Sequence, residues 1–218
     1  MLRYLDVQNI LDKNDLILQE SGCVGSENER GNTYMKKIGI VTDSHSSISQ
    51  EEAEKLGIFV LPMPFYIDGE CFYESVTLSR ELFFEKLAAG ADITTSQPSP
   101  TAVMEIWDRA LEQFEKILYM PISSGLSGSY ETAMMLAKDE AYEGRVLVVD
   151  DGQVAAPLHQ MVLDTLDMIK KGYEAEQIRD LLERAGDRMM IYIALQTLEC
   201  LKKGGRVTPA AAALGTLF

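Results

Sequence analysis

A loop rich in serine and glycine is the stretch of this sequence best suited to chemistry. It runs from Ser123 to Ser129 and holds four serine hydroxyls and two glycines in seven residues. An apolar run over residues 117–120 precedes it and is typical of a buried strand in a parallel sheet. A helix is predicted to follow, burying Ala133, Met134, Leu136 and Ala137. Ligands of α/β proteins collect at the carboxyl ends of strands, and helix N-termini favour anions. The loop therefore has the composition of an anion site.

The same serines also have a purely structural interpretation. Serine is a preferred N-cap, so Ser124 or Ser127 could serve only to accept unpaired amide hydrogens at the start of the helix. The loop by itself leaves the two interpretations about even. Two enzymatic motifs are excluded by the residues present. A nucleophile elbow needs glycine where Ser129 stands. A Walker loop needs a lysine directly after its last glycine, but the first lysine after this loop is Lys138.

Composition excludes several other classes of function. The chain has 218 residues, 34 of them acidic and 20 basic, and its net charge of −14 argues against binding nucleic acid. Its three cysteines, Cys23, Cys71 and Cys200, are far apart, and only His45 and His159 could join them in a metal site. Neither structural zinc nor a disulfide framework is indicated. We therefore expect no metal and no cofactor.

The sequence gives no sign of insertion into a membrane. It lacks an uninterrupted apolar stretch of about 18 residues, as well as a basic region followed by an apolar one at the N-terminus. We accordingly expect no membrane span and a cytoplasmic location. A transient contact with a membrane is left open.

Strand and helix patterns alternate along the chain, which predicts an α/β fold with a parallel sheet of βα units flanked by helices. Strands are predicted at residues 36–43, 58–66, 117–120, 145–150 and 189–195, with a hairpin turn at Asp68-Gly69. Helices are predicted at residues 50–56, 79–89, 101–114, 154–170, 175–185 and 198–202. The helix at 79–89 should turn Leu82, Phe83, Leu87 and Ala88 inward, and residues 94–100 should form a loop.

Three regions of different character are predicted. Residues 1–34, with a short helix at Tyr4–Leu18, are mostly polar and turn-rich and form either a disordered tail or a misassigned extension before Met35. Residues 35–150 form an N-terminal α/β domain. Residues 151–218 form an incomplete second α/β domain, since the sequence stops inside an apolar helix predicted from Thr208.

Four segments in this order resemble the DegV family of bacterial fatty-acid-binding proteins, which present an acyl chain to a fatty acid kinase. They are Val41-Thr42-Asp43-Ser44, Thr95-Ser96-Gln97-Pro98-Ser99, Ser123 to Ser129, and Leu201-Lys202-Lys203-Gly204-Gly205-Arg206. The resemblance covers residues 35–218. The combination of T-S-Q-P-S with S-S-x-L-S-G is far more specific than a single serine-rich loop.

The resemblance implies roles for individual residues. The threonine of T-S-Q-P and the serine of L-S-G hold the lipid carboxylate, and here these are Thr95 and Ser127. Ser96, Ser124, Gly128 and Arg206 are implied as supporting residues. Arg206 has two equally weighted interpretations, a cation near a helix C-terminus or a contact at a domain boundary or with a partner.

Three functions follow as hypotheses. The first is a non-enzymatic carrier that binds a long-chain fatty acid in a tunnel and presents it to a fatty acid kinase. The second is a serine acyl hydrolase that uses Ser127, which needs a general base, and only His45 and His159 are available. The third is an interaction module with an empty pocket. Both histidines are expected to be ordinary surface or capped residues, although small residues are usual in the family where His45 stands.

Overall fold

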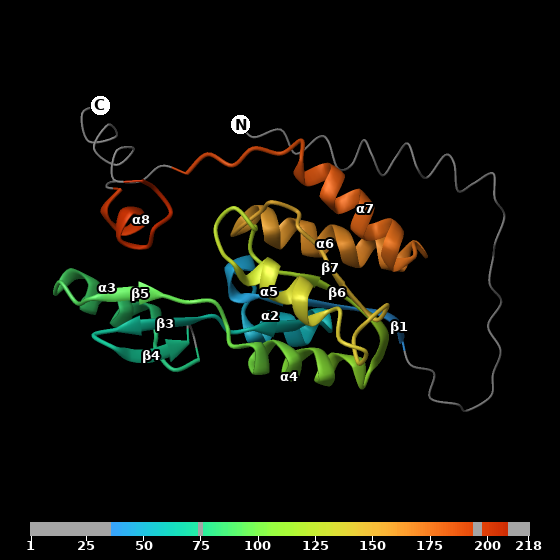
Figure 1. Cartoon of the computed structure of the whole chain (residues 1–218), viewed down its shortest axis with the longest axis horizontal. Helices are drawn as coiled ribbons and strands as arrows, with labels where there is room; N and C mark the ends of the chain where they lie inside the picture. The colour runs from blue at the N-terminus through green and yellow to red at the C-terminus, as the bar shows by residue number, and fades with distance from the viewer. Residues whose placement is uncertain (1–35, 74–75, 194–197, 209–218) are drawn as a thin grey trace. The chain divides into compact units, whose positions relative to one another are not determined.

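The computed structural model describes residues 36–73, 76–193 and 198–208, and these residues form an α/β fold with two sheets (Figure 1). The strands are β1 (Lys36–Asp43), β2 (Phe59–Leu61), β3 (Pro64–Ile67), β4 (Glu70–Tyr73), β5 (Ile93–Thr95), β6 (Phe114–Met120) and β7 (Val146–Val148). The helices are η1 (Ser44–Ser46), α2 (Gln50–Leu56), α3 (Arg80–Ala88), α4 (Pro100–Leu111), α5 (Ser129–Leu136), α6 (Ala156–Lys170), α7 (Ala175–Gly186) and α8 (Glu199–Lys203).

The larger sheet is parallel and confirms the predicted fold class. Its strand order is β2-β1-β6-β7, and Val41 in β1 pairs with Phe59 on one side and Tyr119 on the other. The last four residues of β6 are fully buried, because helices cover both faces of a parallel sheet. At the edge strand β2, the Gln50 side chain donates a hydrogen bond of 3.1 Å to the main-chain oxygen of Val60.

Helices lie on both sides of the parallel sheet, with α4 below it and α6 and α7 above it in Figure 1. Ser99 caps α4, which inserts the fully buried Trp107 against the sheet. The indole ring makes edge-to-face contacts with Tyr119 at 5.4 Å and Tyr142 at 5.2 Å. On the opposite face α6 and α7 contact β1, β6 and β7. Both helices follow residue 151, and the expected domain boundary there stays a prediction.

The smaller sheet is antiparallel, with strand order β4-β3-β5. The hairpin turn at Asp68 and Gly69 is confirmed, and both residues have positive φ, 51° and 86°. The prediction that residues 94–100 form a loop is wrong at its start, because Thr94 and Thr95 belong to β5 and pair with Tyr66 and Phe65. We call the hairpin sheet together with α3 the hairpin region.

Helix α3 begins as predicted, with the Ser79 hydroxyl accepting a hydrogen bond from the N–H of Leu82. Its predicted burial is wrong, since α3 has no buried residue, Leu82 and Leu87 are 42% and 41% exposed, and Ala88 is exposed as well. The half-buried Phe83 packs edge-to-face on Phe65 of β3 at 5.5 Å. One aromatic contact therefore joins α3 to the sheet beneath it.

Other predictions differ from the structure in detail. Helix α5 buries Ala133, with Leu136 and Ala137 packed partly against the core, but Met134 is 37% exposed. The helix predicted at 101–114 ends at Leu111, since Phe114 begins β6.

The end of the described chain also departs from expectation. Residues 189–193 form no strand, and Met190, Tyr192 and Ile193 are exposed. Residues 194 and 195, the helix from Thr208 and the helix at Tyr4–Leu18 lie outside the described residues or extend beyond them. Over the part of the chain that is described, every helix is too short or too polar to cross a membrane.

Candidate functional site

The four sequence segments meet near the carboxyl ends of the parallel strands. Asp43, the last residue of β1, is fully buried, and its Oδ2 atom accepts a hydrogen bond of 2.8 Å from the N–H of Ile122. The hydroxyl of Thr42 donates to the main-chain oxygen of Met120, also at 2.8 Å. These bonds fasten the end of β1 to the chain that leaves β6 and leads into the serine loop.

Gln97 joins the T-S-Q-P segment to helix α5, which follows the serine loop. Its Oε1 atom accepts a hydrogen bond of 3.2 Å from the hydroxyl of Thr132 in α5. The same oxygen would lie 3.1 Å from a Cβ atom at position 128, so Gly128 permits a close approach that a larger residue would crowd. The structure thus brings together Gln97 and Thr132, which are 35 residues apart in the sequence.

Arg206 brings the fourth segment to the same loop. Its Nε atom donates to the main-chain oxygen of Leu126 at 3.3 Å, and Nη1 donates to the main-chain oxygen of Gly204 at the end of α8. Nearby, Lys203 forms an ion pair with Asp92, just before β5. Arg206 therefore contacts both a helix C-terminus and the serine loop, while a role toward a partner stays a prediction.

Within the loop, the hydroxyl of Ser127 lies 2.8 Å from that of Ser129 and also accepts from the Ser129 N–H at 3.3 Å. The N-cap of α5 is Gly128, which supplies no side-chain hydrogen bond. The N–H of Ser124 donates to Oδ1 of Asp150 at 3.3 Å. Ser127 thus accepts one amide hydrogen at the helix start, but neither it nor Ser124 is the N-cap that the structural interpretation expected.

The ring of each histidine lies beside a carboxylate, and neither ring is hydrogen-bonded to Ser127. Nδ1 of His45 lies 3.2 Å from Oδ1 of Asp43, and Nε2 of His159 lies 3.2 Å from Oε1 of Glu52. Among the described residues, no imidazole or carboxylate is hydrogen-bonded to the Ser127 hydroxyl. The same residues contain no group of three His, Cys, Asp or Glu side chains placed to bind a metal. Within the described part of the chain, the histidine rings are thus placed at Asp43 and Glu52.

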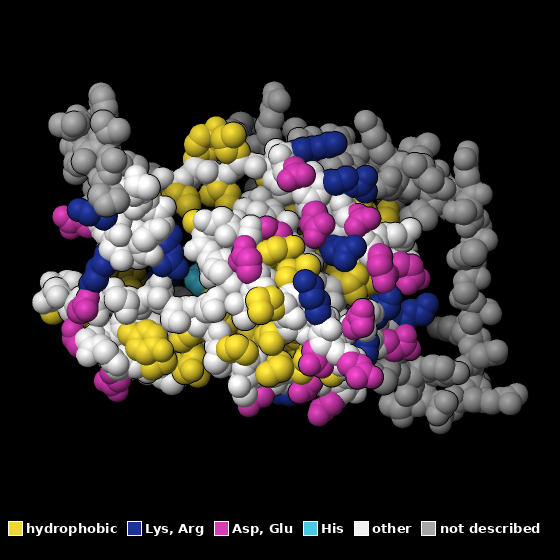
Figure 2. Space-filling model, viewed as in Figure 1, with side chains coloured by type: hydrophobic (Ala, Val, Ile, Leu, Met, Phe, Trp, Pro, Cys, Tyr) yellow, Lys and Arg dark blue, Asp and Glu magenta, His cyan; other side chains and the backbone are white. Residues whose placement is uncertain are grey.

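A cavity of about 550 Å³ lies between η1 and α2 on one side and the hairpin region on the other. Figure 2 shows a hollow in the surface to the left of centre, and the cyan of a histidine side chain is visible inside it. Of the predicted site residues, Thr95 and Ser96 line the cavity, whereas Ser124, Ser127, Gly128 and Arg206 do not. The apolar lining residues are Ile48, Val60, Met63, Pro64, Phe65, Leu78, Phe83, Phe84 and Ile93.

Comparison with known proteins decides the family. A family model described as an uncharacterised protein of the DegV family matches residues 37–218. The chain belongs to the DegV family. It is 34% identical to a DegV domain-containing protein of Deinococcus radiodurans, covering 83% of this chain and 64% of the relative. It is 35% identical to one of Streptococcus pneumoniae, covering 84% and 65%. The chain thus spans just under two thirds of the length of these curated DegV relatives.

Solved structures of DegV proteins share the fold. A Thermus thermophilus DegV family protein, described by its fatty acid binding, superimposes with a TM-score of 0.74 at 34% identity, covering 84% of this chain and 65% of that one. A stearic acid-binding protein of Eubacterium ventriosum gives a TM-score of 0.67 at 26% identity, covering 83% and 63%.

Sequence reasoning missed one buried acid beside the site of this DegV chain. Asp151 is 1% exposed, and its Oδ1 atom accepts from the N–H of Gln153 at 2.9 Å. The pKa of its carboxyl is raised to about 7, mainly by burial, with smaller contributions from the charges of Asp150 and Asp43. The main-chain oxygen of Gln153 in turn accepts from the N–H of Ser123 at 3.0 Å. No sequence signal separates Asp151 from an exposed aspartate after a strand.

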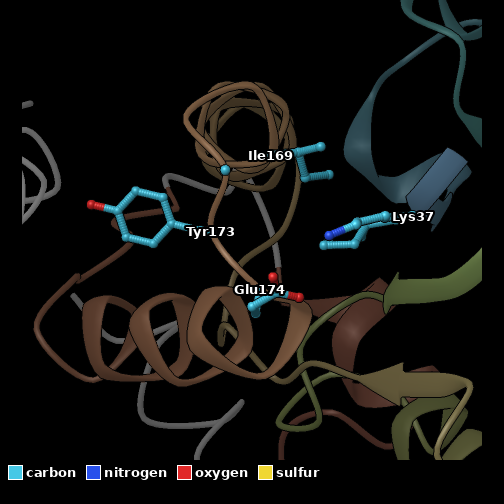
Figure 3. A pocket seen from close by; sticks show the side chains of 6 residues that line it. Lys37, Ile169, Tyr173 and Glu174 are labelled. Carbon is cyan, nitrogen blue, oxygen red and sulfur yellow. The ribbon is translucent and has the colours of Figure 1, made fainter. Parts of the chain in front are cut away.

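A second, smaller cavity of about 260 Å³ lies beside the start of β1, away from the DegV segments. In Figure 3 Lys37 comes from β1, Ile169 from the end of α6, and Tyr173 and Glu174 from the connection between α6 and α7. None of the predicted site residues lines it. The larger cavity is therefore the candidate ligand site.

Proposed function

We propose that this DegV chain is a carrier that binds a long-chain fatty acid in the cavity beside Thr95. The observation that carries this proposal is the combination of a largely apolar cavity of about 550 Å³ with hydroxyl groups of the T-S-Q-P segment on its wall. Small-molecule sites usually measure roughly 300–1,000 Å³ and combine apolar walls with a few polar groups. The fatty acid binding described for the Thermus thermophilus relative supports the same ligand class.

Burial of the acyl chain can supply most of the affinity. About 14 methylenes at roughly 0.8 kcal/mol each contribute on the order of 11 kcal/mol before the costs of ordering the ligand. The polar anchor therefore needs only to orient the carboxylate. Neutral hydroxyls can do this without the cost of burying a cation.

We assign the carboxylate to Thr95 and Ser127. Thr95 and Ile93 alternate with Thr94 along β5, which places Thr95 on the cavity face of the strand. Ser127 lies in the loop before α5, and Gln97 of the same segment as Thr95 accepts a hydrogen bond from Thr132 of that helix. Ser96 on the cavity wall, Ser124 and Gly128 in the loop, and Arg206 on Leu126 are the supporting residues.

We further propose that the carrier acts in the cytoplasm without a cofactor and presents the bound carboxylate to a partner fatty acid kinase. Thr95 and Ser96 are exposed, so the anchored end of the ligand would lie near the surface. The family resemblance supports a kinase as the partner.

Lipid analysis of the purified chain tests the carrier function. Extraction or native mass spectrometry should recover a fatty acid from the protein. A purified protein that contains no lipid and also fails to bind added palmitate and oleate would contradict the proposal. No turnover of a nitrophenyl ester is expected, and turnover abolished by Ser127→Ala would favour a hydrolase instead.

A matched pair of threonine variants tests the anchor. Thr95→Val removes the hydroxyl on the cavity face, and affinity for palmitate should fall about ten- to a hundredfold, since a hydrogen bond to a charged group is worth roughly 1.5–3 kcal/mol. Thr94→Val removes the neighbouring hydroxyl, which does not line the cavity, and should leave affinity unchanged. Equal effects of the two variants would contradict the assignment of Thr95.

A further inference from the structure

The ionisable side chains on the cavity wall share one sign. Among the described residues that line it, only His45 and Arg80 carry ionisable groups, and both are basic. The chain as a whole has a net charge of −14, with 34 acidic residues. The ionisable residues of the wall are therefore basic, whereas the chain as a whole is acidic. Such a wall favours a ligand with an anionic group over an uncharged ligand of the same shape.

His45 is held in a defined orientation at this wall. Its Nδ1 atom and its main-chain N–H both lie near Oδ1 of Asp43, at 3.2 and 2.9 Å. Asp43 is itself fixed, because it is buried and its other oxygen accepts from Ile122. With Nδ1 turned to a carboxylate, Nε2 is the nitrogen left for a ligand, and it has no hydrogen-bond partner among the described residues. The imidazole is 37% exposed, so a ligand can reach it.

Arg80 is placed by the start of α3. Ser79 caps the helix and also lines the cavity, so the first turn of α3 lies at the wall. The guanidinium group lies over the ring of Phe84, 5.8 Å from its centroid, and this ring is part of the apolar lining. The aromatic contact limits the positions that the arginine side chain takes up.

We propose that His45 and Arg80 are specificity-determining residues that make the cavity select an ionised acyl acid over an uncharged lipid of equal length. In the complex, Asp43 lies at Nδ1 of His45, and the ligand carboxylate accepts a hydrogen bond from Nε2–H. Arg80 adds a cation beside the acyl chain. This inference rests on the proposed carrier function, and it adds a charge-based selection to the hydroxyl anchor.

The chain offers close controls for both residues. His159 is the other histidine, and it also lies 3.2 Å from a carboxylate oxygen, but it does not line the cavity. Arg109 lies over the ring of Phe59 at 5.8 Å, the same distance as Arg80 from Phe84, and it is also absent from the wall. Each test variant therefore has a control variant, which loses the same type of side chain and the same type of contact at a position outside the cavity wall.

The experiment compares palmitic acid with 1-hexadecanol, both delivered from cyclodextrin to the full chain, and measures the ratio of the two affinities. His45→Gln and Arg80→Gln should each lower the acid-to-alcohol ratio about tenfold, mainly through weaker acid binding. His159→Gln and Arg109→Gln should leave the ratio within twofold of the wild-type value. Circular dichroism of each variant establishes that it is folded.

Two results would overturn the inference, and they are distinguishable. If the wild-type chain binds palmitic acid but His45→Gln and Arg80→Gln leave the ratio unchanged, or weaken both ligands equally, the charge selection is wrong and the carrier function stands. If the wild-type chain binds neither ligand, the carrier function fails, and the inference fails with it.

Discussion

The parallel sheet and the hairpin region differ in how they bury side chains. In the parallel sheet, residues 117–120 of β6 and Trp107 of α4 are all fully buried between layers. In the hairpin region, α3 has no buried residue and β4 is mostly exposed. Yet the hairpin region supplies Thr95, Arg80 and much of the apolar cavity wall. The comparison indicates that stability is concentrated in one region, while much of the candidate ligand site lies in the other.

The largest expected effect is in the core of the parallel sheet. Trp107→Ala removes a fully buried ring that contacts both Tyr119 and Tyr142. Such truncations typically cost about 3–5 kcal/mol of unfolding free energy, because they leave a cavity in a close-packed interior. Urea unfolding followed by fluorescence and circular dichroism measures the loss. A cost below about 1 kcal/mol would remove the distinction between the two regions.

A smaller effect should come from Asp151, which burial holds partly protonated. Its pKa is raised from 3.8 to about 7, so between these values the native chain keeps a proton that the unfolded chain releases. The stabilisation is complete below about pH 4 and is lost as pH rises to 7, with an upper limit of about 4 kcal/mol at 1.36 kcal/mol per unit.

Urea unfolding across pH 4–8 measures this dependence. Asp151→Asn should flatten it and raise stability above pH 7, since the amide stays neutral and keeps an acceptor for the N–H of Gln153. Asp167→Asn, at an exposed ion pair with Lys170 on α6, serves as the control and should leave the slope from pH 5 to 7 unchanged. An equal slope in Asp151→Asn and the wild type would mean that Asp151 titrates normally.

Elements with a strong local signal were predictable from the sequence. Strands β1, β6 and β7 contain apolar runs. Helices α2, α3 and α4 are each preceded by a serine N-cap that accepts an amide hydrogen bond, namely Ser49, Ser79 and Ser99. The missed elements depend on partners distant in sequence. Strand β5 has three residues, two of them exposed, and it exists because it pairs with residues 65–67. The apolar run at 189–193 has no strand paired with it among the described residues, so it forms none.

The candidate site was predictable only as a set of segments. Sequence patterns and the family resemblance selected Thr95 and Ser127, but they could not show that Gln97 is hydrogen-bonded to Thr132, in the helix that follows the serine loop. They also treated His45 as an ordinary residue, because its place on the cavity wall results from the packing of η1 opposite β5. The predicted burial of Leu82 and Leu87 was wrong for a related reason. Helical periodicity assigns an apolar face, but burial requires a second layer on that face.

The smallest expected effect concerns α3. Leu82→Gln changes an exposed side chain outside the cavity wall and should alter the unfolding free energy by less than about 0.5 kcal/mol. Ile106→Gln makes a matched change on α4, where the side chain is buried, and should cost roughly 2–5 kcal/mol. Thermal and urea unfolding of both variants gives the comparison. A loss of 2 kcal/mol or more in Leu82→Gln would show that α3 is covered in solution.

The hydrogen bond from Gln50 to Val60 has a consequence for aggregation. Edge strands are where foreign chains add to a sheet, since their unpaired backbone groups offer a template. Here β2 has only three residues, and a side chain already occupies one of its carbonyl groups. The opposite edge strand, β7, is equally short. Among the described residues, the addition of strands from other copies is therefore discouraged at both edges of the parallel sheet.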